Sequence, residues 1–155
     1  MKFNFPYKEK GRKLPDPAPK LEATWRAVLE RVRSDPKFAF GRVFIGGKSL
    51  GGRMASRVVA AGEAVDGLVF LGYPLHPAGK PQKQRTAHFP QISVPSLFIQ
   101  GTRDALCDLD LLRKALAQIP ARAELHLVEG GDHSFARPKR MGIAEQQTWR
   151  EVVDA

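Results

Sequence analysis

Three side chains in this sequence have the types needed for nucleophilic catalysis. Ser49 lies within Gly47-Lys48-Ser49-Leu50-Gly51, a G-x-S-x-G pattern with an apolar run before it and a helix-like stretch after it. Such a pattern holds a serine on a sharp strand-to-helix turn, where its hydroxyl projects over the edge of the sheet. A histidine can take the proton of that serine, and a carboxylate can orient the histidine. Asp104 and His133 supply these groups, so we expect a Ser49-His133-Asp104 triad.

Strands and helices must alternate along the chain to bring these residues together. We expect strands at 2–5, 42–45, 67–72, 96–100 and 124–128, and helices at 19–34, 50–61, 109–118 and 144–153. This alternation predicts a single domain over residues 1–155, built as a three-layer α/β/α sandwich with a mostly parallel sheet. Each triad candidate follows a strand at its carboxyl end, where the functional loops of such sheets lie.

Other acidic residues compete for the role of the triad carboxylate. Asp132 adjoins His133, but a neighbour in sequence cannot easily reach the Nδ1 atom of the same ring. Asp108 and Asp110 stand at the start of a predicted helix and look like capping residues. Each triad candidate, taken singly, could also be a helix cap, a turn cap or a surface loop residue. Their joint placement at three strand ends favours the triad.

The same serine motif resembles the end of a phosphate-binding loop, G-x-x-x-x-G-K-[ST]. That loop needs glycine at position 42, where this sequence has Arg42, and Gly41 is one residue too early. We therefore reject nucleotide binding, although Lys48 could attract an anionic substrate. The four histidines and one cysteine show no metal-ligand spacing, so we expect no metal and no cofactor.

Composition indicates an ordinary globular protein, with 43% hydrophobic residues and a mean hydropathy of −0.31. No apolar run approaches the ~20 residues of a membrane span, and the N-terminus lacks the apolar stretch of a signal peptide. The single cysteine, Cys107, rules out an internal disulfide and fits a reducing compartment. We expect a cytoplasmic protein that does not contact membranes.

The net charge of +9 raises the hypothesis of nucleic-acid binding, which would show a steep salt dependence. Basic residues gather at 8–13, 80–85 and 137–140. None of these clusters interleaves aromatic residues as single-strand binders do. We interpret the clusters as solvated loops and expect no nucleic-acid partner.

The chain order Ser, Asp, His and several motifs resemble the α/β-hydrolase superfamily. The sequence is most similar to a small, lidless, dienelactone-hydrolase-like branch, which includes the testis-expressed-30 and KAT8-regulatory-subunit-3 types. The matching segments cover nearly the whole chain, at 3–7, 46–54, 72–77, 100–104 and 130–135. The resemblance implies that Ser49 is the nucleophile, His133 the base and Asp104 its orienter.

These residues predict hydrolysis of a small ester or thioester through an acyl-enzyme, with the Leu50 N–H as an oxyanion donor. We expect Tyr7, Lys48, Tyr73 and His76 to contact the substrate, although the two tyrosines could instead be half-buried packing residues. The alternative function is a non-catalytic protein-interaction module with a vestigial triad. It stays open because the branch includes a non-catalytic subunit of a chromatin complex.

The resemblance also predicts an irregularity in the sheet. In the superfamily a second oxyanion N–H comes from a loop after an earlier strand, usually marked by His-Gly, and this sequence contains no His-Gly dipeptide. We therefore expect an N-terminally shortened fold, with a gap between the strand at 3–5 and the strand near Val43. Either these two strands pair, or a second chain fills the gap as in a homodimer, or the N-terminus is loosely held.

Overall fold

The computed structural model describes residues 1–38 and 41–155. Its centre is a sheet of four strands in the order β1-β2-β3-β4, and every neighbouring pair is parallel. The strands are β1 (Phe44–Lys48), β2 (Gly67–Leu71), β3 (Ser96–Gly101) and β4 (Ala123–Val128). The helices are α1 (Pro6–Glu9), α2 (Ala18–Ser34), α3 (Leu50–Ala60), α4 (Leu109–Leu116) and α5 (Glu145–Asp154). The predicted parallel α/β fold is confirmed.

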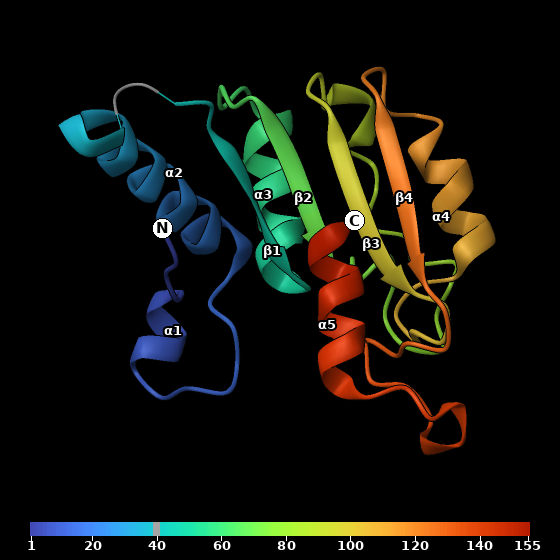
Figure 1. Ribbon diagram of the computed structural model, residues 1–155. Coiled ribbons are helices and arrows are strands. Elements are labelled where there is room, and N and C mark those ends of the chain that lie inside the picture. The colour runs from blue at the N-terminus through green and yellow to red at the C-terminus, as the bar shows by residue number, and fades with distance from the viewer. Residues whose placement is uncertain (39–40) are drawn as a thin grey trace.

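Helices lie on both faces of the sheet, with α5 in front and α3 and α4 behind in the view of Figure 1. Side chains alternate between these faces along the strands, as strand geometry requires. Phe70 and Phe98 belong to the large core cluster that contains the buried residues of α2, α3 and α4. Ile99 instead packs with Val152 of α5 in a second cluster. The two clusters make the three layers of the predicted sandwich.

Helix α2 forms as predicted because its apolar residues recur at helical spacing. Leu21, Trp25 and Leu29 are four residues apart, and all three are buried. The indole N–H of Trp25 donates to the Gly51 carbonyl at 3.2 Å, which ties α2 to the start of α3. Among the described helices, none has both the length and the apolar character needed to cross a membrane.

The predicted strand at 2–5 is wrong. These residues form no strand, and Pro6 begins α1 directly after them, a position where proline's fixed φ favours a helix. The ring of Phe3 packs edge-on against Trp25, with centroids 4.8 Å apart. Among the described residues, no backbone hydrogen bond joins residues 1–5 to β1. The arrangement in which the first strand pairs with the strand near Val43 is therefore also wrong, and β1 is an edge strand.

Candidate active site

Ser49 lies on a strained turn between β1 and α3. Its φ of 53° and ψ of −118° form a conformation that costs a non-glycine residue about 1–3 kcal/mol. The Ser49 N–H donates to the Leu71 carbonyl at 3.0 Å, and the Ser49 carbonyl accepts from the Arg53 N–H at 3.1 Å. β1 runs on to Lys48, beyond the predicted end at Ile45, so the strand leads directly into this turn.

The turn brings α3 close to β1 at Gly52. A Cβ atom on Gly52 would lie 2.5 Å from the Gly47 carbonyl oxygen and 3.0 Å from the Phe70 ring. A Cβ atom on Gly51 would meet nothing within 4 Å. The G-x-S-x-G motif includes Gly47 and Gly51 but not Gly52, the glycine that the close approach needs.

We expect Gly52→Ala to lower the free energy of unfolding by about 1–3 kcal/mol, because the added methyl group meets backbone that cannot move aside. Gly51→Ala is the matched control, and it should keep or raise stability because alanine favours helix over glycine. Urea denaturation followed by circular dichroism measures both variants. Equal decreases in the free energy of unfolding of the two variants would contradict a close approach of the backbone at Gly52.

A continuous chain of hydrogen bonds joins Ser49, His133 and Asp104. The Nε2 atom of His133 lies 2.8 Å from Ser49 Oγ, and its Nδ1 atom lies 2.7 Å from Asp104 Oδ2. Because a carboxylate only accepts, Nδ1 carries the ring proton and Nε2 accepts from the serine hydroxyl. The side chain of Asp104 is 0% exposed and that of His133 is 28% exposed. His133 can therefore withdraw the serine proton while Asp104 stabilises the imidazolium.

Gln100, near the end of β3, holds Asp104 in place. Its Nε2 donates to Asp104 Oδ2 at 2.6 Å, and the Leu106 N–H donates to Oδ1 at 2.8 Å. The Oε1 atom of Gln100 accepts from the Tyr73 N–H at 2.8 Å, and the residue is 0% exposed. The sequence reasoning missed this residue. The signal that could have identified Gln100 is a side-chain amide directly after the apolar residues of β3.

Gln100→Leu should lower the free energy of unfolding by about 1–3 kcal/mol, because the buried Tyr73 N–H loses its acceptor and Asp104 loses a donor. Gln118→Leu makes the same chemical change at an exposed position and should have little effect. Urea denaturation of both variants is the measurement. A Gln100→Leu protein as stable as the parent would show that these bonds are not needed to hold the loop.

The loop that carries His133 fits closely over the end of β3. A Cβ atom on Gly101 would lie 2.3 Å from a carbonyl oxygen of that loop, so only glycine allows the approach. Asp132 stays outside the triad. Its Oδ1 atom accepts from the N–H groups of Ser134 at 2.7 Å and Ala136 at 2.9 Å, and so closes the loop. The expectation that Asp132 does not reach the neighbouring ring is confirmed.

The same fold occurs in a known family. The family model described as an alpha/beta hydrolase domain matches residues 1–155. The chain belongs to the α/β-hydrolase family. Among solved structures, a dienelactone hydrolase from Anabaena variabilis superimposes with a TM-score of 0.67 at 20% identity, over 94% of this chain and 63% of that chain.

Two further solved α/β hydrolases support the same fold. A serine hydrolase homologue from Coxiella burnetii has a TM-score of 0.67 at 19% identity, over 92% of this chain and 62% of that chain. A dienelactone hydrolase-like promiscuous phosphotriesterase from metagenomic libraries has a TM-score of 0.65 at 16% identity, over 88% of this chain and 59% of that chain. The chain thus spans less than two thirds of the length of these structures. The predicted α/β-hydrolase superfamily is confirmed.

One surface groove of this α/β hydrolase contains Ser49. It is also lined by two of the expected substrate contacts, Tyr7 and Lys48, and by Leu50, the expected oxyanion donor. Leu50 is the first residue of α3, where backbone N–H groups have no acceptor within the helix. Lys48 is exposed, and its Nζ donates to Ser134 Oγ at 3.3 Å. Within residues 1–38 and 41–155, no cluster of three His, Cys, Asp or Glu side chains is placed to hold a metal ion.

Tyr73 and His76, two of the expected substrate contacts, are buried, and their polar side-chain atoms have hydrogen-bond partners within the protein. Tyr73 is 1% exposed, its hydroxyl donates to the Arg85 carbonyl at 3.1 Å, and burial raises its pKa to about 12. His76 is 5% exposed. Its Nδ1 lies 2.9 Å from the Pro77 carbonyl, and its Nε2 accepts from the Asp108 N–H at 2.9 Å.

A second serine–histidine pair packs beside α3, with Ser56 Oγ 2.7 Å from His88 Nε2. Ser56 is 0% exposed, and burial lowers the pKa of His88 to about 4. Within the described chain, no carboxylate hydrogen-bonds to His88. Burial also raises the pKa of the Cys107 thiol to about 12, which disfavours the thiolate. Ser49, in contrast, contacts a histidine that also hydrogen-bonds to a carboxylate.

The low pKa of His88 predicts a pH-dependent stability. The folded protein keeps His88 neutral down to about pH 4, whereas the unfolded chain binds a proton near pH 6.5, the ordinary pKa of histidine. This contribution to stability is present above pH 6.5 and is lost as the pH falls toward 4. His88→Gln should flatten that part of the curve of unfolding free energy against pH. Parallel curves of unfolding free energy against pH for the parent and His88→Gln would contradict a lowered pKa of His88.

Proposed function

We propose that this α/β-hydrolase domain cleaves a small ester or thioester through an acyl-enzyme, with Ser49 as the nucleophile. The supporting observation is the unbroken hydrogen-bonded chain from Ser49 through His133 to Asp104. Membership of the hydrolase family supports the general class of reaction. The choice of an acyl bond follows from the chemistry of an activated serine, which attacks carbonyl carbon.

In the first half of the reaction, Ser49 Oγ attacks the substrate carbonyl while His133 Nε2 takes its proton. The negative charge that develops on the carbonyl oxygen is stabilised by the Leu50 N–H at the start of α3, where the helix dipole also favours an anion. The intermediate then breaks its bond to the leaving alcohol or thiol. That group leaves with the proton from His133, and the acyl group stays on Ser49.

In the second half, His133 removes a proton from water, and the resulting hydroxide equivalent attacks the acyl-Ser49 ester. The acid is released, and the proton returns to Ser49 Oγ. Lys48 and Tyr7 are the proposed substrate contacts, since they line the same groove as the nucleophile. The exposed ammonium group of Lys48 favours substrates with an anionic substituent near the ester.

Hydrolysis of p-nitrophenyl acetate by the parent chain and by Ser49→Ala tests the proposal. We expect Ser49→Ala to lose about 10³-fold or more in kcat/KM. Ser56→Ala removes a serine that also contacts a histidine but is buried, so it should keep nearly full activity. Equal rates for the parent and Ser49→Ala would reject the proposal and favour a non-catalytic interaction module.

A further inference from the structure

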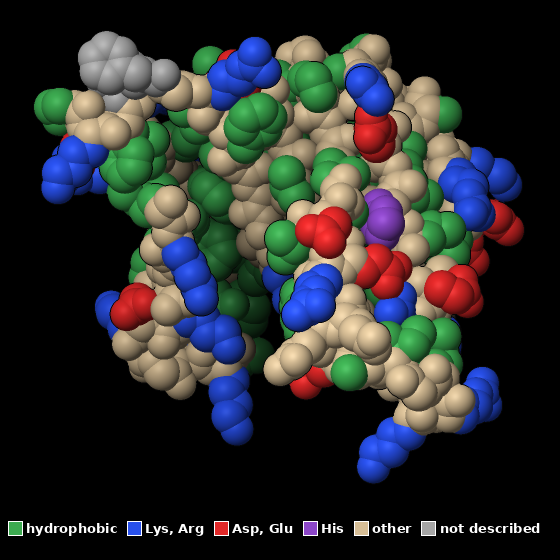
Figure 2. All heavy atoms as spheres, in the orientation of Figure 1, with side chains coloured by type: hydrophobic (Ala, Val, Ile, Leu, Met, Phe, Trp, Pro, Cys, Tyr) green, Lys and Arg blue, Asp and Glu red, His purple; other side chains and the backbone are tan. Residues whose placement is uncertain are grey.

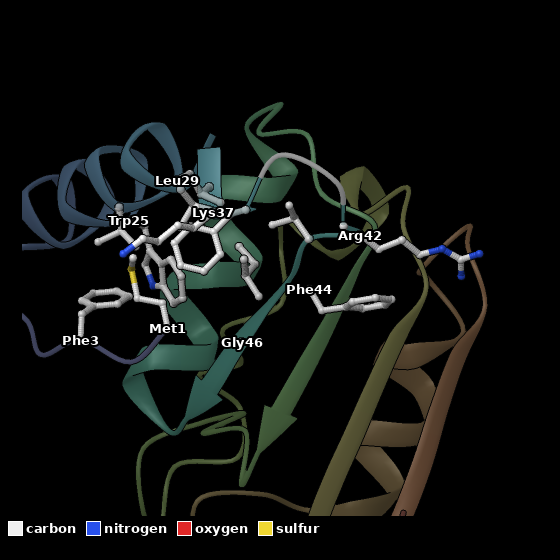
Figure 3. Close-up of a pocket in the computed structure, with 14 residues that line it drawn as sticks. Met1, Phe3, Trp25, Leu29, Lys37, Arg42, Phe44 and Gly46 are labelled. Atoms are coloured by element: carbon white, nitrogen blue, oxygen red, sulfur yellow. The ribbon is translucent and has the colours of Figure 1, made fainter. Parts of the chain in front are cut away.

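Helix α5 helps to hold the loop that carries His133. This loop spans residues 129–137, directly after β4, and we call it the His133 loop. None of these residues lines the pocket beside β1 that Figure 3 shows around Phe3, Trp25 and Phe44. The chain leads instead from the loop to α5, on the face where Figure 2 shows acidic and basic side chains together. The contacts between the loop and α5 therefore bear on the position of His133.

The His133 loop contains a strained residue. Phe135 has a φ of 64°, in the left-handed region that a bulky side chain rarely adopts. Such a conformation persists only where the surrounding structure enforces it. Phe135 is 2% exposed, and its ring packs edge-on against Trp149 of α5 with centroids 5.8 Å apart. Packing on α5 therefore helps to hold the strained backbone two residues after His133.

Arg137 closes the other end of the loop. It belongs to the basic cluster at 137–140 that we interpreted as a solvated loop, but its side chain is only 6% exposed. Its Nε donates to the Glu129 carbonyl at 2.8 Å, which joins the first and last residues of the loop. Its terminal nitrogens donate to Thr148 Oγ1 at 3.4 Å and to the carboxylate of Glu151, both on α5. One guanidinium thus fixes the two ends of the loop to each other and to α5.

The two halves of the loop are held differently. The first half is bonded to the segment that follows β3, where Thr102 Oγ1 accepts from the Gly130 N–H at 2.8 Å. Among the described residues, no backbone hydrogen bond joins residues 134–137 to the sheet. This second half is attached to α5 through Phe135 and Arg137. The side of the loop that follows His133 therefore depends on α5.

We propose that Arg137 is a positioning residue for His133, because it holds the second half of the loop against α5. The imidazole ring then stays aligned between Ser49 and Asp104 despite the strain at Phe135. A displacement of about 1 Å at a reacting group costs about 10²-fold in rate, so a distant residue of this kind can control catalysis. The effect on catalysis rests on the proposed hydrolase function, whereas the position of the ring can be measured without any hydrolysis.

Proton NMR of the His133 ring tests the proposal directly. A proton held between Nδ1 and a buried carboxylate exchanges slowly and resonates at low field, and His133→Gln identifies its signal in the parent. Arg137→Gln should lose this signal while circular dichroism shows a folded protein. Arg113→Gln is the matched control and should keep the signal, because Arg113 pairs with Asp110 on the exposed face of α4.

Glu151→Gln is a second variant that keeps the test decisive if Arg137→Gln does not fold. It removes the charge of the partner but keeps a hydrogen-bond acceptor for Arg137. The same low-field signal should broaden in this variant. Loss of the signal in the Arg113→Gln control as well would show a general effect of removing surface charge and would overturn the proposal.

Kinetics separate positioning from a purely structural role. In Arg137→Ala, kcat and kcat/KM for p-nitrophenyl acetate should both fall about tenfold or more, since the substrate does not contact this residue. Guanidinium chloride, at concentrations far below those that unfold proteins, should restore activity by refilling the space of the missing side chain. Arg113→Ala should keep the parent rate and should not respond to guanidinium.

Two results would overturn the proposal. The first is a folded Arg137→Gln protein that keeps both the low-field signal and the parent kcat. The second is a loss of activity that follows the loss of stability and is not restored by guanidinium, because Arg137 would then serve the fold alone. A parent that hydrolyses no ester but loses the signal only in the Arg137 and Glu151 variants would reject the proposed function and support the positioning role.

Discussion

A carboxylate with no exposed surface must find its hydrogen-bond donors inside the protein, and the side chain of Asp104 is in that position. Gln100 supplies one donor from β3, the Leu106 N–H supplies another, and the His133 ring supplies the third. Each bond fixes a different segment relative to the end of the sheet. Because His133 is held through Nδ1, its Nε2 atom faces the Ser49 hydroxyl. The position of His133 relative to the Ser49 hydroxyl therefore depends on the hydrogen bonds that the buried Asp104 carboxylate accepts.

The sequence predicted Ser49, Asp104 and His133 as a group because each lies within a few residues of the end of a strand. Apolar runs fixed the places of β2, β3 and β4, and a parallel sheet brings their carboxyl ends to one edge. The contacts that support these three residues could not be predicted from the sequence. Gln100 and Gly52 act through tertiary neighbours, and no local pattern reports which backbone approaches a glycine or which carboxylate lies beside an amide.

The predictions for Tyr73 and His76 rest on their positions in the sequence alone. Both follow β2, at the edge of the sheet where ligands bind, so their positions along the chain suggested a substrate pocket. Their positions did not reveal that both side chains are buried, with the hydroxyl of Tyr73 and the ring nitrogens of His76 bonded within the protein. The error at residues 2–5 arose from local strand propensity. Pro6 starts a helix there, and the phenyl ring of Phe3 packs on Trp25 in place of strand pairing.

The central claim is that Ser49 is activated by His133, and covalent labelling with a fluorophosphonate tests it most directly. Peptide mapping by mass spectrometry identifies the modified residue in the parent chain and in His133→Ala. The account predicts a label on Ser49 alone in the parent, and labelling slower by about 10³-fold in His133→Ala. A label on Ser56, no label on any serine, or equal rates in the two proteins would contradict it.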